Sequence, residues 1–309
     1  MNQILSGRPK FVFYFLSFLL PLLAWSVVSY VPFVWHPQIL IEDAGSVDYF
    51  QPGLRIDRER FDRESANAHA ANRAPPAGIP ANPIYLPAPD EVLGGLYAAF
   101  TTPPPTRDGK WLHESIWQSI QVIFWGFVIS SAFGVPIGIL CGASVVISRF
   151  TEPFVEFFRY LPAPAFGALA VAVLGIYDGP KIAIIVIGTF FQQVLIIANS
   201  TRKLEKSFVE AALTLGTKRP QLLWRVIVPG VMADVYRDQR ILLGWAWTYL
   251  IVAELIGTTS GITWFITQQA RYQHFPNMYA AILIIGIIGL GTDTCLAWLG
   301  RHLFPWAGH

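Results

Sequence analysis

Long stretches without a charged side chain are the feature that most limits the possible folds of this chain. They comprise residues 11–41, 115–148, 160–177, 182–201, 241–253 and 273–292. A helix of roughly 20 residues crosses the hydrocarbon core of a bilayer, and most of these runs approach or exceed that length. Hydrophobic residues make up 53% of the 309-residue sequence and charged residues only 14%, which is too apolar for a soluble domain. The chain is therefore expected to be an integral membrane protein.

These runs predict an all-α membrane protein with about six spanning helices. We place them at residues 11–34, 115–141, 154–176, 181–201, 240–258 and 279–300. The third and fifth have the weakest hydropathy signal, because the third begins among Glu156 and Arg159 and the fifth contains Glu254. The first apolar run is too long for the core of a secretory signal peptide, so it is expected to remain as a helix.

The distribution of basic residues predicts the orientation of these helices. Short cytoplasmic loops carry an excess of lysine and arginine, whereas long loops cross the membrane largely regardless of charge. One side of the predicted membrane holds Arg8, Lys10, Arg149, the basic residues from 202 to 240, and Arg301. The short loops of the other side hold only Lys181 and Arg271. Both termini and the loop after residue 202 are therefore expected in the cytoplasm.

The loop from residue 204 to 230 is polar and basic, yet its sequence predicts two short helices. Apolar and small residues recur at helical spacing at Leu204, Phe208, Ala211, Ala212 and Leu215. Gly216 can end that helix by adopting a left-handed backbone conformation. A second helix is expected to begin near Pro220 and to stop at Pro229-Gly230. By itself, such a loop could also be an amphipathic segment on the lipid surface.

The spacing within this loop resembles a known signature. Glu210-Ala211-Ala212 is followed after three residues by Gly216, and Val226-Ile227-Val228-Pro229 follows after nine more. This order is similar to the EAA motif (Glu-Ala-Ala, three residues, Gly, nine residues, Ile-x-Leu-Pro) of permease subunits in binding-protein-dependent ABC importers. From about Glu114 to Arg301 the chain resembles the nitrate, sulfonate, taurine and bicarbonate branch of that family. The matching segments are 119–127, 152–162, 244–247, 253–257, Gly261 and 286–293.

The resemblance implies a type I ABC importer permease fold in a prokaryotic inner membrane. The loop with Glu210, Ala211, Ala212, Gly216 and Pro229 would be the coupling helix that seats in a groove of the ATPase. The implied partners are two ATP-binding cassette subunits, an external solute-binding protein, a second copy of this chain and the lipid bilayer. No cofactor is expected on this chain, because ATP and Mg would be held by the partner ATPase. The solute would be small, for example nitrate, a sulfonate or taurine, although the branch also imports uncharged or cationic heterocycles.

A Pro-rich segment from His36 to His113 follows the first helix and is expected outside the cell. Its charged centre, Arg55 to Glu64, predicts a short solvated helix with ion pairs worth ~0.2–0.5 kcal/mol each. The alternative to a solvated helix without a specific role is a docking surface for the binding protein or a lid over the external gate. Tyr85 to Val92 resembles the Leu-Pro-x-Pro start of an interfacial helix in the same branch, with Asp90 at its N-cap or first turn.

The domains follow from these boundaries. We expect a first helix (1–35), the external segment with its interfacial helix (36–113), and a permease core with five helices (114–303). The coupling loop (204–230) lies within this core.

Polar side chains within the predicted spans are candidates for the translocation path or its gate. They are Glu254, Trp245, Gln192, Gln193 and Arg159. An ionisable residue inside a span is costly, and the branch shares the Ala-Glu pair at 253 and 254 across substrates, so a structural or gating role is favoured for Glu254. Interhelical hydrogen bonds are favoured for the two glutamines. Arg159 is expected to pair with Glu156 or with a lipid phosphate, and the alternative is that it attracts anions. Trp245 is expected to pack in the core or to line the path.

Other functions are excluded or kept as alternatives. The sequence has no Gly-x-x-x-x-Gly-Lys-Ser/Thr loop, so this chain is not expected to hydrolyse ATP. Its six histidines and two cysteines show no metal-ligand spacing. The net charge of +2 argues against a nucleic-acid partner. The alternative to an importer subunit is a proton-coupled secondary transporter in which Glu254 and Asp293 relay protons. A membrane enzyme is the third possibility.

Overall fold

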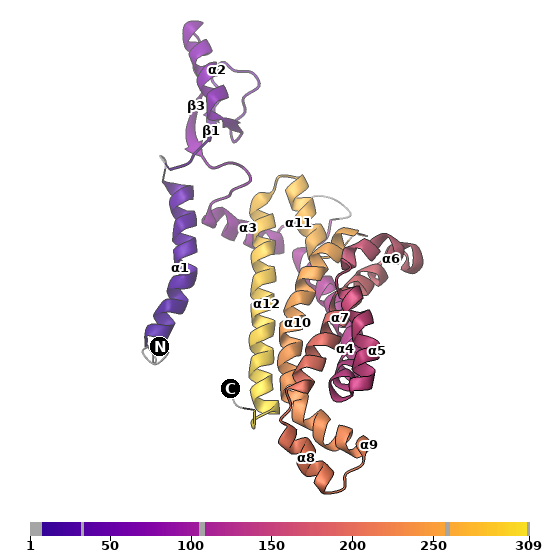
Figure 1. The fold of residues 1–309 in the computed structure, drawn as a ribbon. Coiled ribbons are helices and arrows are strands. Elements are labelled where there is room, and N and C mark those ends of the chain that lie inside the picture. The colour runs from indigo at the N-terminus through magenta and orange to yellow at the C-terminus, as the bar shows by residue number, and fades with distance from the viewer. Residues whose placement is uncertain (1–7, 32–33, 105–108, 257–259, 308–309) are drawn as a thin grey trace. The chain divides into compact units, whose positions relative to one another are not determined.

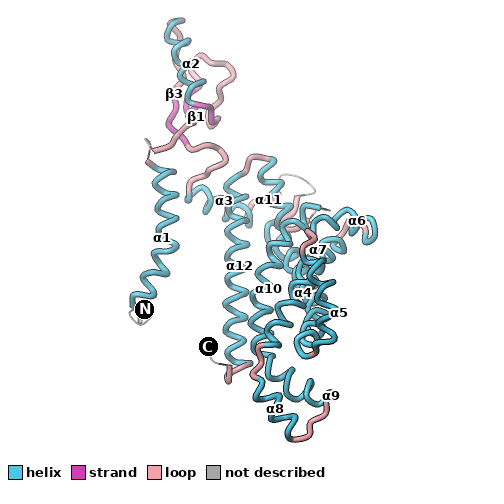
Figure 2. The backbone as a smooth tube through the Cα atoms, in the orientation of Figure 1, coloured by secondary structure: helices cyan, strands magenta, loops and turns pink. Residues whose placement is uncertain are grey.

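The computed structural model describes residues 8–31, 34–104, 109–256 and 260–307 (Figure 1). Most of the described chain is helical, as predicted, and its strands lie between residues 38 and 81 (Figure 2). The chain divides into two compact units. The N-terminal unit comprises residues 1–103 and 267–280, and the core unit comprises residues 104–266 and 281–309.

In the N-terminal unit, a small antiparallel sheet follows the first helix, α1 (Arg8–Tyr30). Its strands are β1 (Gln38–Asp43), β2 (Arg55–Asp57) and β3 (Ala77–Ala81), with β1 in the centre. Helix α2 (Arg58–Ala70) comes directly after β2. These elements share a small apolar core that contains Ile41, Val47, Phe50, Ile56 and Phe61. The sequence did not predict this sheet, because its strands are short and carry proline or charged residues.

The charged stretch from Arg55 to Glu64 is only partly helical, so the prediction of a single solvated helix was wrong. Its first three residues form β2 and pair with β1, because Ile56 packs into the small apolar core from that strand. Helix α2 begins only at Arg58. An exposed ion pair joins Glu59 and Arg63 on successive turns, with 3.8 Å between the carboxylate and guanidinium atoms.

The helix expected near Asp90 is present as α3 (Pro89–Thr101). The Glu91 carboxylate accepts a hydrogen bond from the Ala88 backbone N–H at 2.9 Å, which satisfies a donor at the start of the helix. Glu91 also pairs with Arg55 of β2 at 2.6 Å, so α3 is tied to the sheet. The Tyr30 hydroxyl donates a hydrogen bond to Asp90, which holds the pKa of that carboxyl below its ordinary value.

The core unit is built from helices. They are α4 (Leu112–Ala143), α5 (Val145–Arg159), α6 (Gly167–Leu174), α7 (Asp178–Arg202), α8 (Lys206–Thr214), α9 (Arg219–Leu222) and α10 (Val228–Ile256), with a 3-10 segment at Ala163–Phe166 and a π segment at Leu223–Ile227. Helices α11 (Ile262–Arg271) and α12 (Phe275–Leu303) each contribute residues to both units.

Helix α4 packs closely along α7 through the face that its glycines form. A Cβ at Gly138 would lie 2.8 Å from the Ile197 Cβ, and side chains of α7 approach Gly134 and Gly142 in the same way. The four-residue spacing of these glycines gives α4 a smooth face, which allows this close approach. Pro136 lies inside the helix without ending it.

Among the described residues, four helices are long and apolar enough to cross a membrane: Val12–Tyr30 of α1, and the whole of α4, α7 and α12. A fifth crossing is formed if α5 and the helical segment 163–174 count as one broken span. The span expected over 154–176 is broken in the structure, because the chain bends by 84° between these two segments. Pro162 and Pro164 lie at the bend, and proline restricts both its own backbone and the residue before it.

The predicted stop at Pro229-Gly230 was also wrong. The chain winds from α9 through the π segment directly into α10, which therefore begins well before the predicted residue 240. Pro229 is the second residue of α10, and the wider π turn before it relieves the clash and the missing hydrogen bond that proline causes inside a regular helix. The early part of α10 carries Asp234, Arg237, Asp238 and Arg240, which explains why hydropathy places the span later.

Candidate functional site

The predicted coupling loop forms a hairpin of α8 and α9, and Gly216 makes the bend. Gly216 has φ +78°, the left-handed region that glycine adopts without strain. Its N–H bonds the Leu213 carbonyl at 2.9 Å, and the Thr217 N–H bonds the Ala212 carbonyl at 3.1 Å. This pair of bonds is the Schellman motif, which ends a helix sharply. A Cβ at Gly216 would meet nothing within 4 Å, so the position requires backbone freedom rather than small size.

The hairpin exposes both apolar and charged side chains. Leu215 is 86% exposed and Trp224 69% exposed, and Phe208 and Leu213 are also more than half exposed. Glu210, Ala211 and Pro229 are exposed as well, whereas Ala212 is buried. The hairpin also exposes the basic side chains Lys206, Lys218, Arg219 and Arg225. Exposed large apolar side chains accompanied by charged ones are typical of a protein interface.

The base of the hairpin is fixed to the helices of the core unit. Leu204, Leu222 and Leu223 pack against a buried cluster that includes Ile197 of α7 and Val231 of α10. A movement of the exposed hairpin would therefore be transmitted to α7 and α10.

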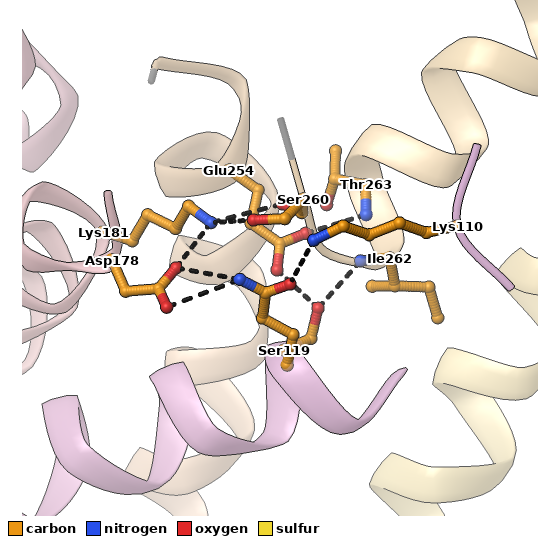
Figure 3. Close-up of polar contacts among 9 residues, drawn as sticks. Lys110, Ser119, Asp178, Lys181, Glu254, Ser260, Ile262 and Thr263 are labelled. Carbon is orange, nitrogen blue, oxygen red and sulfur yellow. Dashed lines mark hydrogen bonds and ion pairs between the residues drawn. The ribbon is translucent and has the colours of Figure 1, made fainter. Parts of the chain in front are cut away.

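Glu254, the predicted carboxylate within a span, holds the start of α11. It is 1% exposed, and its Oε2 accepts a hydrogen bond from the Thr263 backbone N–H at 2.8 Å (Figure 3). The Ser119 hydroxyl of α4 donates to its other oxygen, and the Ser119 oxygen accepts the Ile262 N–H at 2.8 Å. Two of the unpaired N–H groups at the N-terminus of α11 are thereby satisfied.

A buried lysine continues this network. Lys181, in the first turn of α7, is 1% exposed and donates to Asp178 at 2.8 Å and to the hydroxyl and carbonyl oxygens of Ser260 at 2.9 and 3.2 Å (Figure 3). Gln118 of α4 donates to Asp178 at 3.2 Å and accepts from Lys110 at 3.2 Å. Helices α4, α7, α10 and the start of α11 thus meet in one polar cluster, which we call the Glu254 cluster.

Gln193 is the centre of a second polar cluster. It is fully buried, its Oε1 accepts from Ser130 at 2.6 Å, and its Nε2 donates to Ser131 and to Gln239, both at 2.9 Å. These bonds connect α7 with α4 and α10, as expected for interhelical bonding. Gln192 is partly buried beside it.

The remaining predicted residues of the path lie apart from these clusters. Trp245 is 44% exposed on α10. Arg159 stacks over the Tyr160 ring with 4.8 Å to its centroid, and no ion pair with Glu156 forms among the described residues. Asp293 of α12 pairs with Arg240 of α10 through two contacts of 2.9 and 3.0 Å.

Sequence reasoning missed Ser119, Lys181, Ser260 and Gln239. Serine and glutamine are too common in spanning helices to indicate a site, and Lys181 lies at the predicted end of a span, where a lysine is expected in the loop. The glycine at position 261 is the one residue of the sequence that could have pointed to this site. In the structure its φ is +108°, and a Cβ there would collide with the Glu254 carboxylate.

These features define a helical membrane protein with an exposed hairpin between its core helices. The chain belongs to the family of binding-protein-dependent transport system inner membrane components, whose model matches residues 134–309. It is a permease subunit of an ABC importer.

Relatives and solved structures agree with this assignment. A probable ABC transporter permease protein of Brucella melitensis is 34% identical over 62% of this chain and 78% of its own length. The taurine transport system permease protein TauC of Escherichia coli is 30% identical over 74% of this chain and 82% of its own length. Among solved structures, the inward-facing MetNI methionine ABC transporter matches 64% of this chain and 98% of its own, with a TM-score of 0.57 and 16% identity, which supports the fold alone.

Proposed function

We propose that this subunit moves a small solute inward through a path between two copies of itself, using ATP hydrolysed by separate chains. In this proposal the hairpin of α8 and α9 is the cytoplasmic contact with the ATPase. An external binding protein delivers the solute, and both termini lie in the cytoplasm. ATP-driven closure of the two ATPases draws the hairpins together and switches the spans between inward-open and outward-open states.

The observation that carries the proposal is the exposure of large apolar side chains on the hairpin, above all Leu215 and Trp224. Exposing such side chains to water is unfavourable, and a groove on a partner removes that cost. The Schellman bend at Gly216 holds the two helices in a fixed shape, so the hairpin can transmit force rather than fold upon contact.

For the solute we propose a small sulfonate such as taurine. The support is the likeness to the taurine permease of Escherichia coli, which extends over most of both chains. The buried carboxylate of Glu254 is not a contact for the anion, because like charges repel and its oxygens already accept the N–H and O–H donors of its neighbours.

The proton-coupled alternative is less favoured. Its relay would use Glu254 and Asp293, yet Asp293 forms a two-contact ion pair with Arg240, and Glu254 bonds the start of α11. Protonating Asp293 during each cycle would weaken its ion pair with Arg240, and protonating Glu254 would weaken the hydrogen bonds that hold the start of α11.

The test is to purify the chain together with its ATPase and binding protein and to measure uptake of labelled taurine into proteoliposomes. We expect uptake that requires ATP and persists when the proton gradient is removed. Replacing Leu215 and Trp224 by serine should release the ATPase during purification, whereas Trp306→Ser, another exposed tryptophan, should retain it. Uptake without ATP that collapses with the proton gradient would instead support the secondary transporter.

A further inference from the structure

A long apolar groove lies in the core unit between α4, α10 and α12. It has a volume of about 690 Å³, and its walls include Phe124, Val128 and Ala132 of α4 and Leu296 of α12. Along α10 it extends from Met232 to Leu243. At a rise of 1.5 Å per residue this is roughly 17 Å, which is the length of a considerable part of an extended acyl chain.

A small cationic cavity adjoins this groove along α10. The cavity has a volume of about 60 Å³, shares Tyr236 and Arg240 with the groove, and is also lined by Arg237 and Arg301. We call it the arginine cavity. Because the groove and the cavity have residues in common, apolar and cationic surfaces are continuous there.

The arginine cavity carries an excess of positive charge. Arg237 pairs with Asp234 at 3.2 Å, and Arg240 pairs with Asp293 at 2.9 Å. Within the part of the chain that the structure describes, Arg301 has no carboxylate at ion-pair distance. Three guanidinium groups thus face two carboxylates.

We propose that the groove and the arginine cavity together bind one anionic phospholipid. An acyl chain would lie along the apolar walls, and the phosphate would lie at the arginine cavity, where guanidinium groups donate several hydrogen bonds to phosphate oxygens. An apolar ligand would match the groove alone, and a free anion would match only the cavity. A molecule with both parts matches the continuous surface, and cationic pockets between spanning helices are suited to lipid headgroups.

The bound lipid would support the contact between α10 and α12. Across this region the Tyr236 hydroxyl donates to the Leu296 carbonyl at 2.8 Å, and Arg240 pairs with Asp293. Apolar side chains of α10 and α12 line the groove, so an acyl chain in it would contact both helices. This inference is independent of the transported solute.

The experiment is native mass spectrometry of the purified complex, after exchange into detergent with either phosphatidylglycerol or phosphatidylcholine. We expect phosphatidylglycerol to be retained preferentially. Arg301→Gln should weaken its retention about fivefold, because one basic group near a lipid phosphate contributes that much. Arg149→Gln, an exposed arginine on α5 outside the groove, is the matched control and should change nothing.

A second pair of variants tests the groove itself. Ala132→Trp should fill it and reduce lipid retention while the arginines remain, whereas Ala168→Trp, on the exposed face of α6, should not. Equal retention of both lipids, with no effect of Arg301→Gln, would overturn the proposal. So would a disulfide or crosslink from Ala132→Cys to a second copy of the chain in the native membrane, because the groove would then be covered by protein.

Discussion

At the scale of single residues, Glu254 acts as a hydrogen-bond acceptor for a neighbouring helix. Its two oxygens accept from Ser119 and from the Thr263 backbone, and the group is almost completely buried. The position therefore needs acceptors more than it needs a charge. This explains how a carboxylate can be accommodated in a span without a direct role in carrying protons.

We predict that Glu254→Gln retains substantial ATP-dependent uptake, whereas Glu254→Leu does not. The amide keeps one acceptor oxygen, but leucine leaves both donors unpaired, and each unpaired buried donor costs ~1–3 kcal/mol. Thermal unfolding of the purified complexes should rank wild type above Glu254→Gln, and Glu254→Gln above Glu254→Leu. Loss of all uptake in Glu254→Gln, with its stability unchanged, would show that the charge itself is required.

Gly261 should be intolerant of any side chain. Its φ of +108° is strained for other residues, and a Cβ would occupy the space of the Glu254 carboxylate. Gly261→Ala should therefore destabilise the protein by roughly 1–3 kcal/mol and lower uptake. Gly244→Ala on α10 is the control, because a Cβ there meets nothing within 4 Å. Similar melting temperatures for the two variants would contradict this account.

At the scale of elements, the hairpin of α8 and α9 depends on the backbone conformation of Gly216. Its Cβ direction is open, so side-chain size alone should matter little. We predict that Gly216→Asn keeps most solute-stimulated ATPase activity, because asparagine tolerates the left-handed region. Gly216→Val should uncouple transport while the subunit still inserts, since a β-branched residue there costs roughly 1–3 kcal/mol. Equal activity of the two variants would exclude the bend as the coupling feature.

Proline has opposite effects at two places in the core unit: the helix breaks between α5 and α6, whereas the helical run from α9 into α10 is continuous. Pro162 and Pro164 accompany a bend of 84°, whereas Pro229 lies in an unbroken helical run. The difference is the π turn before Pro229, which accommodates the proline ring. The same residue type therefore ends one element and not another, depending on the turn before it.

At the scale of the whole molecule, the predicted topology can be tested by labelling cysteines. In a Cys295→Ser background, a cysteine in place of the exposed His69 of α2 should react with a membrane-impermeant maleimide in intact spheroplasts. A cysteine in place of Leu215, 86% exposed in the hairpin, should react only after permeabilisation. The reverse pattern would show that the positive-inside argument fails for this chain.

The folded segment between α1 and α3 is predicted to tune docking of the binding protein. Neutralising Glu59, Asp62 and Arg63, all exposed on α2, should raise the half-saturation concentration for uptake and leave basal ATPase activity intact. Phe50→Ala, which removes a buried ring from the small core, should unfold this segment and give at least the same effect. An unchanged half-saturation concentration in both variants would mean that the segment takes no part in docking.

The sequence by itself determined the membrane class, the position of most spanning helices, the glycine face of α4 and the bend at Gly216. These features are local, because transfer of a chain segment into lipid and the backbone freedom of glycine depend on nearby residues alone. The tertiary structure decided which polar groups are partners. Ser119 and Glu254 are 135 residues apart, and Lys181 and Ser260 are 79 apart, so no spacing in the chain could pair them. It also decided the sheet after α1, because its short strands are stabilised by pairing and by a shared core rather than by their own propensities.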